Sequence, residues 1–263
     1  MIHNFLRLVL ERLRREVFLA TPLSIVISPI YIIRRGLYLA IREIAPSFKG
    51  HVLDFGYGSK PYESLFTGVE KYVGLDMLVT GHPHSSSRVD VFYDGERLPF
   101  HDASFDGIVS FEVLEHVFNP EIVLNELRRV LKPGGIMLVT VPFAWDEHEV
   151  PFDFARYTSY GLQSVLERAG FEVVHKLKTC GYVLAIGQLV CAYLYQHVLP
   201  RGLIASKIAQ FLVLFPLNVF FLIVDRILPR RDQFYCNNVV VARRRSEQTT
   251  CLPKDELHIG AER

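Results

Sequence analysis

The chain of 263 residues has few cysteines, and none of them are close together. No C-x-x-C pair occurs, so the pattern favours neither a zinc site nor a disulfide framework. Widely spaced thiols of this kind are typical of a protein that stays reduced in the cytosol. The four positions are Cys180, Cys191, Cys236 and Cys251.

A complete dinucleotide-binding fingerprint is also missing. Residues 52–58 read V-L-D-F-G-Y-G, the end of a buried strand followed by Gly56 and Gly58. The G-x-G-x-x-G pattern would need a third glycine at position 61, where Pro61 stands. Proline suits the first turn of a helix, so we predict a strand, a glycine turn and a helix. Pro61 argues against a nicotinamide-dependent dehydrogenase, a rival that would share the fold.

The net charge is only +1, but the charged residues are unevenly distributed along the chain. Residues 51–181 carry eleven Lys and Arg against nineteen Asp and Glu, a balance of −8. Residues 1–50 have a balance of +5 and residues 182–231 a balance of +4. An acidic core without a basic groove makes nucleic acid a poor substrate. The two basic segments are also the most apolar ones.

Further motifs follow the glycine turn in a fixed order. An apolar strand ends at Asp76, twenty residues after Gly56, and residues 94–100 read D-G-E-R-L-P-F. A third apolar strand, residues 104–111, is followed by E-V-L-E-H. Asn119 and Pro120 then open an amphipathic helix, and another strand spans residues 136–141. Alternating strands and helices of this kind predict an α/β fold with a mostly parallel sheet.

Together these motifs resemble class I S-adenosylmethionine-dependent methyltransferases, type 11 family, over about residues 50–181. The resemblance implies a Rossmann-like sheet of parallel strands with an antiparallel last strand, and S-adenosylmethionine as cofactor. Lys60 stands where that family usually has a third glycine, which leaves open a cofactor-binding module without catalysis. The family's amino-group enzymes carry N/D-P-P-Y where this chain has Phe111 and Glu112, so an oxygen acceptor fits better.

The same resemblance implies roles for individual residues. The methionine part of the cofactor would be held by the glycine turn, and the ribose by the acid that ends the second strand. The adenine would bind at the D-G dipeptide, and the reactive side would be lined by the residues that leave the strand ending at position 111. These residues are Asp54, Gly56 and Gly58, then Asp76 and Met77, then Asp94 and Gly95, and finally Phe111 and Glu112.

Two groups of residues could take part in chemistry. If a helix starts at Glu112, it would place Glu112, Glu115 and His116 on one face, as a base cluster or a cation site. A similar E-x-x-E-H occurs in quinone-biosynthesis O-methyltransferases. The alternative is that Glu115 and His116 only orient the loop, and we expect no metal there.

The second group, residues 145–158, resembles the H-x-x-P-x-D-x-x-R-[YF]-T stretch of a type 11 subgroup linked to glycans and lipid-linked substrates. His148 is the best candidate for the general base, with His116 second. Asp153, Arg156 and Tyr157 would contact the substrate, although Asp153 and Arg156 could equally form a structural ion pair.

Apolar segments flank the core. A basic amphipathic helix is expected over residues 5–17 and a second helix over residues 30–44, either covering the cofactor or packed on the core. About fifty residues separate the last two strands, residues 171–179 and 234–242. Within them, residues 182–198 and 210–224 are helical in length and apolar nearly all round. The membrane, a partner subunit or the N-terminal helices must bury this hairpin.

We therefore divide the chain into N-terminal helices (1–50), core (51–181), apolar insert (182–231), last strand (232–243) and a disordered tail (244–263). We predict an O-methyltransferase acting on a lipid-linked, quinone or glycan acceptor, cytoplasmic and peripheral on the inner face of the membrane. The alternative is a small-molecule methyltransferase whose insert is a dimer interface. Full spanning is disfavoured, because each stretch is near the lower length limit and contains Gln or Asn.

Overall fold

The computed structural model describes residues 20–21, 24–56, 61–77 and 89–246. Gly58, the expected helix over residues 5–17 and most of the tail lie outside these ranges. The described part is built on one sheet of seven strands in the order β3-β2-β1-β4-β5-β7-β6. The strands are β1 (Gly50–Phe55), β2 (Val69–Met77), β3 (Val91–Tyr93), β4 (Phe105–Phe111), β5 (Leu131–Pro142), β6 (Phe171–Thr179) and β7 (Asn237–Arg244).

Strands β1 to β5 pair in parallel, whereas β7 runs antiparallel to both of its neighbours, β5 and β6. The predicted class I methyltransferase sheet, parallel with an antiparallel last strand, is confirmed. The short β3, for which the sequence analysis gave no bounds, forms the sheet edge between Asp76 and Ser104. Since the carboxyl ends of parallel strands meet at one edge, the predicted cofactor residues gather there.

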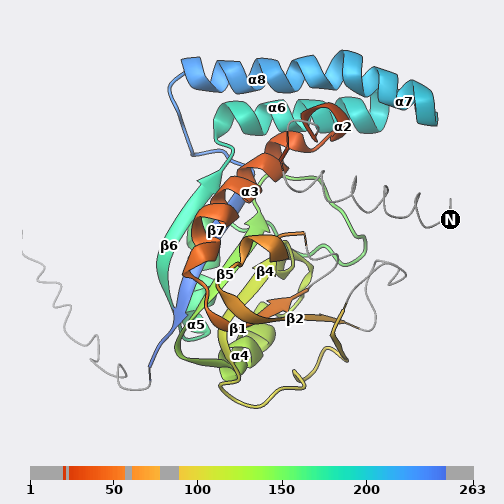
Figure 1. Cartoon of the computed structure of the whole chain (residues 1–263). Coiled ribbons are helices and arrows are strands. Elements are labelled where there is room, and N and C mark those ends of the chain that lie inside the picture. The colour runs from red at the N-terminus through yellow and green to blue at the C-terminus, as the bar shows by residue number, and fades with distance from the viewer. Residues whose placement is uncertain (1–19, 22–23, 57–60, 78–88, 247–263) are drawn as a thin grey trace, which may run out of the picture.

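Both faces of the sheet are covered (Figure 1). On one face Leu53, Ile108 and Val139 pack with α4 (Pro120–Val130) and α5 (Ser159–Arg168). On the other, their chain neighbours, such as Val52 and Val109, pack with α3 (Tyr31–Ile44). Successive strand residues point to opposite faces, which explains why these strands are apolar without interruption. Helix α3 is therefore packed on the sheet, one of the two alternatives for that segment.

Two predicted helices are wrong in the described residues. After the glycine turn, residues 61–68 contain only the 3₁₀ turn η2 (Glu63–Leu65). After β4, the helix expected from Glu112 is replaced by the 3₁₀ turn η4 (Leu114–His116). Glu112 itself has a φ of 57°, a left-handed conformation that cannot begin a right-handed helix.

The insert between β6 and β7 forms a helical hairpin across one end of the sheet (Figure 1). Its first arm is α6 (Tyr182–Tyr193), continued by the π-helical turn η5 (Leu194–Val198). Its second arm runs through α7 (Leu203–Ala209), the π-helical turn η6 (Gln210–Leu214) and α8 (Phe215–Ile227). The predicted helix over residues 210–224 is present, and the second arm begins earlier and ends later than that apolar stretch.

The hairpin is fastened to the body by a third apolar cluster that includes Ile32, Cys180, Leu184 and Cys236. Two buried amides add polar links. Gln188 accepts from the Ile33 N–H at 3.1 Å and donates to the Pro29 carbonyl at 3.0 Å. Helix α6 therefore lies between the body and α8, as Figure 1 shows.

A short helix, α2 (Ser24–Ile27), precedes α3 and contacts the second arm of the hairpin. Asn218 of α8, which is fully buried, donates to the Ile25 carbonyl at 3.4 Å. Two of the amides that the sequence suggested would oppose membrane insertion, Gln188 and Asn218, thus bind the protein's own backbone. The 3₁₀ turn η1 (Ala45–Ser47) connects α3 to β1.

Candidate functional site

The site lies at the carboxyl ends of the parallel strands, and its first part is the turn after β1. Gly56 has a φ of 75°, and a Cβ there would lie 2.3 Å from a Val113 methyl carbon. Only glycine fits, since both the conformation and the space exclude a side chain. Asp54 is buried and accepts from the Tyr72 hydroxyl at 2.7 Å. Burial and the Asp54 charge raise the pKa of Tyr72 well above its usual value, so this hydroxyl remains a donor.

The predicted ribose and adenine residues come together at the ends of β2 and β3. Burial, followed by the charges of Asp76 and Asp94, raises the pKa of Tyr93 to about 12. Asp76 accepts from the Met77 N–H at 2.8 Å. A Cβ on Gly95 would lie 2.9 Å from the Met77 methyl carbon, so these two residues are in contact. Residues predicted from two separate motifs thus border one region.

Glu112 follows β4 with a left-handed backbone that its neighbours hold in place. Its N–H donates to the Thr140 carbonyl at 3.0 Å and lies 3.1 Å from the Thr140 hydroxyl. Asn237 donates to its carboxylate at 2.6 Å. Burial raises the pKa of Glu112 to about 7, opposed by the Thr140 hydrogen bond and by the charges of Arg34 and Arg156. A strained residue held this firmly is typical of functional sites.

Thr140, Asn237 and Arg34 were not identified from the sequence. Asn237 and Asn238 are two buried amides in an otherwise apolar strand, and that pattern could have indicated a polar site. Arg34 comes from α3, nearly eighty residues before Glu112, and no local pattern connects the two. Phe111 is half-buried and makes an edge-to-face contact with Tyr62, with ring centroids 5.0 Å apart. It therefore faces the α3 side.

Glu115, His116 and His148 form a compact cluster next to Glu112. The His116 and His148 rings meet edge to face with centroids 4.7 Å apart. Burial, followed by the Glu112 charge, raises the pKa of Glu115 well above its usual value. Burial and the His116 charge lower the pKa of His148, so at neutral pH this imidazole carries a free lone pair. The structure brings together both residues predicted as bases, from two different motifs.

Asp153 and Arg156 form an ion pair, as one of the two alternatives for these residues predicted. The other alternative was contact with the substrate. The guanidinium donates to both Asp153 oxygens at 2.6 Å, and it also donates to the Asp146 carbonyl at 2.7 Å. Arg156 lowers the pKa of Asp153 to about 2. The pair ties together the loop that carries His148, whose N–H donates to Asp153 at 2.8 Å.

Tyr157 packs against the sheet core, and its carbonyl accepts from Asn238 at 2.7 Å. Burial, then the Glu115 charge, raises its pKa. The side chain of the next residue, Thr158, caps α5 by accepting from the Gly161 N–H at 3.0 Å. Both contacts fix the end of the loop against the core.

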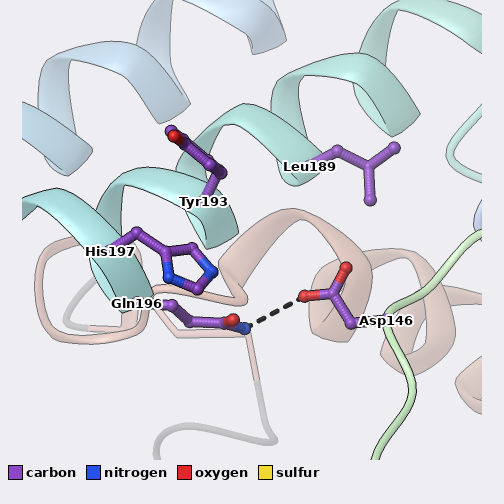
Figure 2. Close-up of a pocket in the computed structure, with 5 residues that line it drawn as sticks. All are labelled: Asp146, Leu189, Tyr193, Gln196 and His197. Atoms are coloured by element: carbon purple, nitrogen blue, oxygen red, sulfur yellow. Dashed lines mark hydrogen bonds between the residues drawn. The ribbon is translucent and has the colours of Figure 1, made fainter.

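A cavity of about 490 Å³ lies between this loop and the hairpin. Figure 2 shows Leu189, Tyr193, Gln196 and His197 from the first arm lining it, with Asp146 on the opposite side. The Gln196 amide donates to the Asp146 carboxylate at 3.1 Å. Asp146 also contacts the His148 ring through its carbonyl oxygen, at 3.2 Å from Nδ1. The cavity therefore lies beside the loop that carries His148, although neither His148 nor His116 is among the residues that line it.

The central part of the chain is similar to known methyltransferases. Residues 53–139 match the family described as methyltransferase domain, type 11. A probable S-adenosylmethionine-dependent methyltransferase of Mycolicibacterium smegmatis is 34% identical over 46% of this chain and 52% of its own length. An O-methyltransferase of Penicillium expansum is 28% identical over 50% of this chain and 55% of its own length.

The chain thus spans about half the length of these curated relatives. A demethylmenaquinone methyltransferase of Streptomyces griseus is 32% identical over 40% of this chain and 47% of its own. Among solved structures, an S-adenosylmethionine-dependent methyltransferase from Mesorhizobium loti has a TM-score of 0.49 at 17% identity, covering 80% of this chain and 98% of its own.

Proposed function

Since residues 53–139 form a methyltransferase domain of the class I, S-adenosylmethionine-dependent type, we propose that this protein methylates an oxygen atom of an amphiphilic acceptor at a membrane surface. The observation that carries the proposal is the cavity beside Asp146. It opens between the apolar hairpin and the loop with His148, so an acceptor could leave its apolar part on the hairpin while its polar end reaches the site.

The residues at the strand ends fit S-adenosylmethionine. Gly56 makes the tight turn after β1, where Val113 occupies the place of a Cβ, and the carboxylates of Asp76 and Asp94 flank one region. One oxygen of Glu112 has no hydrogen-bond partner among the described residues, as expected where a ligand would complete the site. When bound, the cofactor supplies the methyl group on a good leaving group, so the protein mainly has to align the acceptor.

An oxygen acceptor must lose a proton, and His148, or else His116, remains our predicted base. The lowered pKa of His148 supports a role that needs a free lone pair at neutral pH. Asp153, Arg156 and Tyr157 support the same site by holding the loop, and substrate contact by them remains a prediction. The quinone-related name of one relative makes a quinone one plausible acceptor class beside lipid-linked and glycan acceptors.

Membrane contact is supported by the outer surface of the second arm, which exposes large apolar side chains: Ile204, Ile208, Phe211, Leu212, Phe220, Ile223 and Ile227. Basic residues stand beside them, namely Arg201, Lys207, Arg226, Arg230 and Arg231. Apolar side chains flanked by basic ones suit an interfacial helix on anionic lipid, with about 1 kcal/mol per basic residue near the surface.

Residues 204–227 form a helix of 24 residues that is long and apolar enough to cross a membrane. Its length alone no longer argues against spanning. We favour a helix lying in the plane of the surface, because α8 packs along α6, and α6 packs on the body (Figure 1). The hairpin would then lie on the inner face of the membrane, and the acidic core would face away from the lipid, toward the cytoplasm.

Vesicle flotation tests the membrane part of the proposal. The full chain should float with anionic vesicles, and more weakly at high salt because salt screens the basic flank. Phe211→Asp with Leu212→Asp should abolish flotation. The matched control is Phe118→Asp with Ile122→Asp, exposed apolar residues beside and on α4, which should leave flotation unchanged. No flotation at any salt, together with a stable soluble dimer, would instead make the hairpin a dimer interface with a small-molecule acceptor.

The chemical part needs a separate measurement. Incubation with isotopically labelled S-adenosylmethionine and lipid extracts, followed by mass spectrometry, should reveal a labelled amphiphile. Calorimetry should show binding of S-adenosylmethionine and not of NAD, and Asp76→Ala should weaken it by roughly 1–3 kcal/mol. Cofactor binding without any labelled product would point to the alternative of a non-catalytic binding module.

A further inference from the structure

We propose that Glu115, His116 and His148 bind one divalent transition-metal ion. Each offers one ligand atom, and the three atoms lie within 4.8 Å of one another. The spacing of Glu115 and His116 alone favoured no metal. His148, more than thirty residues later in the chain, joins them only in the folded protein, and three details of their surroundings support a metal site.

The first detail is the carboxylate of Glu115, which is completely buried. Neither of its oxygens has a hydrogen-bond partner among the described residues. The backbone of Glu115 is fixed by its carbonyl, which accepts from the N–H groups of Phe154 and Ala155 at 2.8 and 3.2 Å. Buried polar groups are rarely left unsatisfied, so this buried carboxylate indicates an additional ligand.

The second detail is the orientation of His116. Its Nδ1 lies 2.7 Å from the Phe152 carbonyl oxygen, which can only accept, so Nδ1 carries the hydrogen. The lone pair is therefore on Nε2, which is buried and has no hydrogen-bond partner in the described chain. That Nε2 lies 3.8 Å from Oε1 of Glu115. An imidazole fixed by a carbonyl at one nitrogen and free at the other is the usual arrangement of a metal-binding histidine.

The third detail is the matching arrangement of His148. Its Nδ1 lies 3.2 Å from the Asp146 carbonyl oxygen and 3.3 Å from Oδ2 of Asp153, and both are acceptors. These contacts place the hydrogen on Nδ1 and the lone pair on Nε2. A nitrogen of Arg156 is also 3.4 Å from Nδ1, but that donor already has Asp153 and the Asp146 carbonyl as closer partners.

The ligand set selects the kind of ion. Two imidazoles and one carboxylate suit Zn²⁺, Mn²⁺, Fe²⁺ or Co²⁺, whereas Mg²⁺ and Ca²⁺ prefer oxygen ligands throughout. With metal–ligand bonds of about 2.0–2.2 Å, neighbouring ligand atoms lie about 3–3.5 Å apart. The 3.8 Å between His116 and Glu115 therefore requires a closure of a few tenths of an ångström, and pairs of ligand atoms up to 4.8 Å apart require a closure of more than about 1 Å.

Three protein ligands leave a position on the ion open, as in catalytic rather than structural sites. Oε1 of Glu149 also lies 3.8 Å from Nε2 of His116, so a second carboxylate lies beside this cluster. The cluster follows directly after Glu112, on the side where the acceptor would be. An oxygen of the acceptor could occupy the open position, which is the one element of this inference that rests on the proposed function. Metal binding itself does not depend on methyl transfer. With the ion bound, neither His148 nor His116 would have a lone pair for the base, and the ion would instead ease loss of the acceptor proton by lowering the pKa of an oxygen bound to it.

The test is a titration of the full chain, first treated with a chelator, with Co²⁺ followed by visible absorption and with Zn²⁺ followed by calorimetry. We expect one ion per chain. Glu115→Gln, which keeps the shape of the side chain, and His148→Ala should each weaken binding at least about tenfold. His175→Ala, on the exposed side of β6, is the matched control and should bind as the wild type does.

Absence of binding, or equal binding by all variants, would overturn the proposal and leave a buried water as the partner of Glu115. Circular dichroism checks that Glu115→Gln is folded, and if it is not, the half-exposed His148 provides the decisive variant. Calorimetry with S-adenosylmethionine on the same samples separates the two proposals. Metal binding without cofactor binding would refute the proposed function only, and the reverse would refute the metal site only.

Discussion

In the sheet, the apolar side chains of β1, β4 and β5 are buried on both faces, and the polar groups at the strand ends gather in one site. In the hairpin, two buried amides bind the body, while a row of large apolar side chains on the second arm is exposed. The same residue types therefore contribute to stability in one region and are available for contact in the other. The exposed surface of the second arm is the one that we propose contacts the membrane.

The sharpest test of this difference uses one residue type in both regions. Ile108 of β4 is completely buried, whereas Ile208 of α7 is 54% exposed. Ile108→Ala should lower the free energy of unfolding by about 4 kcal/mol, since it loses burial and leaves a cavity. Ile208→Ala should change it by less than about 0.5 kcal/mol. Urea denaturation without lipid measures both, and similar losses would mean that another surface covers the second arm in solution.

The next effect concerns a buried acid at the strand ends of the sheet region. Glu112 has a pKa of about 7 in the folded protein, raised from 4.5 by burial. As the pH rises, the Glu112 carboxyl loses its proton near pH 4.5 in the unfolded chain but only near pH 7 in the folded protein. The stability that the protonated carboxyl contributes is therefore complete below pH 4.5 and is lost as the pH rises to 7. Between pH 4 and 8 the loss should be about 3 kcal/mol.

Glu112→Gln should remove this part of the pH dependence, whereas Glu172→Gln, at an exposed position on β6, should keep the wild-type profile. Urea titrations at several pH values measure both. A wild type equally stable at pH 4 and pH 8 would contradict the raised pKa of Glu112.

A smaller loss is expected where the two arms of the hairpin meet. A Cβ on Gly187 of α6 would lie 2.4 Å from the Phe221 ring of α8, so Gly187→Val should force the arms apart. We expect a loss of about 2 kcal/mol in thermal or urea unfolding, as for other overpacked contacts. Gly202→Ala is the control, since the nearest atom to its Cβ would be 3.9 Å away. Unchanged stability of Gly187→Val would show that α6 and α8 separate freely.

The smallest loss of stability is expected at the N-terminus of α5, which packs on the sheet. Thr158→Ala removes the side chain that caps α5 and should cost about 1 kcal/mol. Thr158→Ser keeps the hydroxyl and should retain most of the stability. If Ser and Ala destabilise equally, the loss comes from the threonine methyl group and the cap contributes nothing measurable.

Much of this molecule could be predicted from local patterns. Runs such as V-L-D-F-G and F-D-G-I-V-S-F are apolar, short and ended by glycine or an acid, which indicates buried parallel strands wherever they occur. The order of Asp54, Gly56, Asp76 and Asp94 predicted the cofactor edge of the sheet, because parallel strands bring their carboxyl ends together. The long apolar insert between β6 and β7 was also evident from its composition.

Other features depend on contacts between distant parts of the chain. The expected helix at Glu112 failed, because Thr140 and Asn237 hold that residue in a left-handed conformation that no local pattern encodes. The cluster of His116 and His148 needs the Asp153–Arg156 ion pair to fold the loop back onto η4. The amides of the insert, read as obstacles to a membrane, instead bind residues 24–33.

The sequence by itself therefore determined the strands, the glycine turn and the family of the central domain, because these depend on neighbours within a few residues. Only the tertiary structure decided which face of the hairpin is exposed, which acids share the site and which histidines meet. Those outcomes depend on packing between segments 30 to 190 residues apart, and hydrogen bonds across such separations leave no periodic signal in the chain.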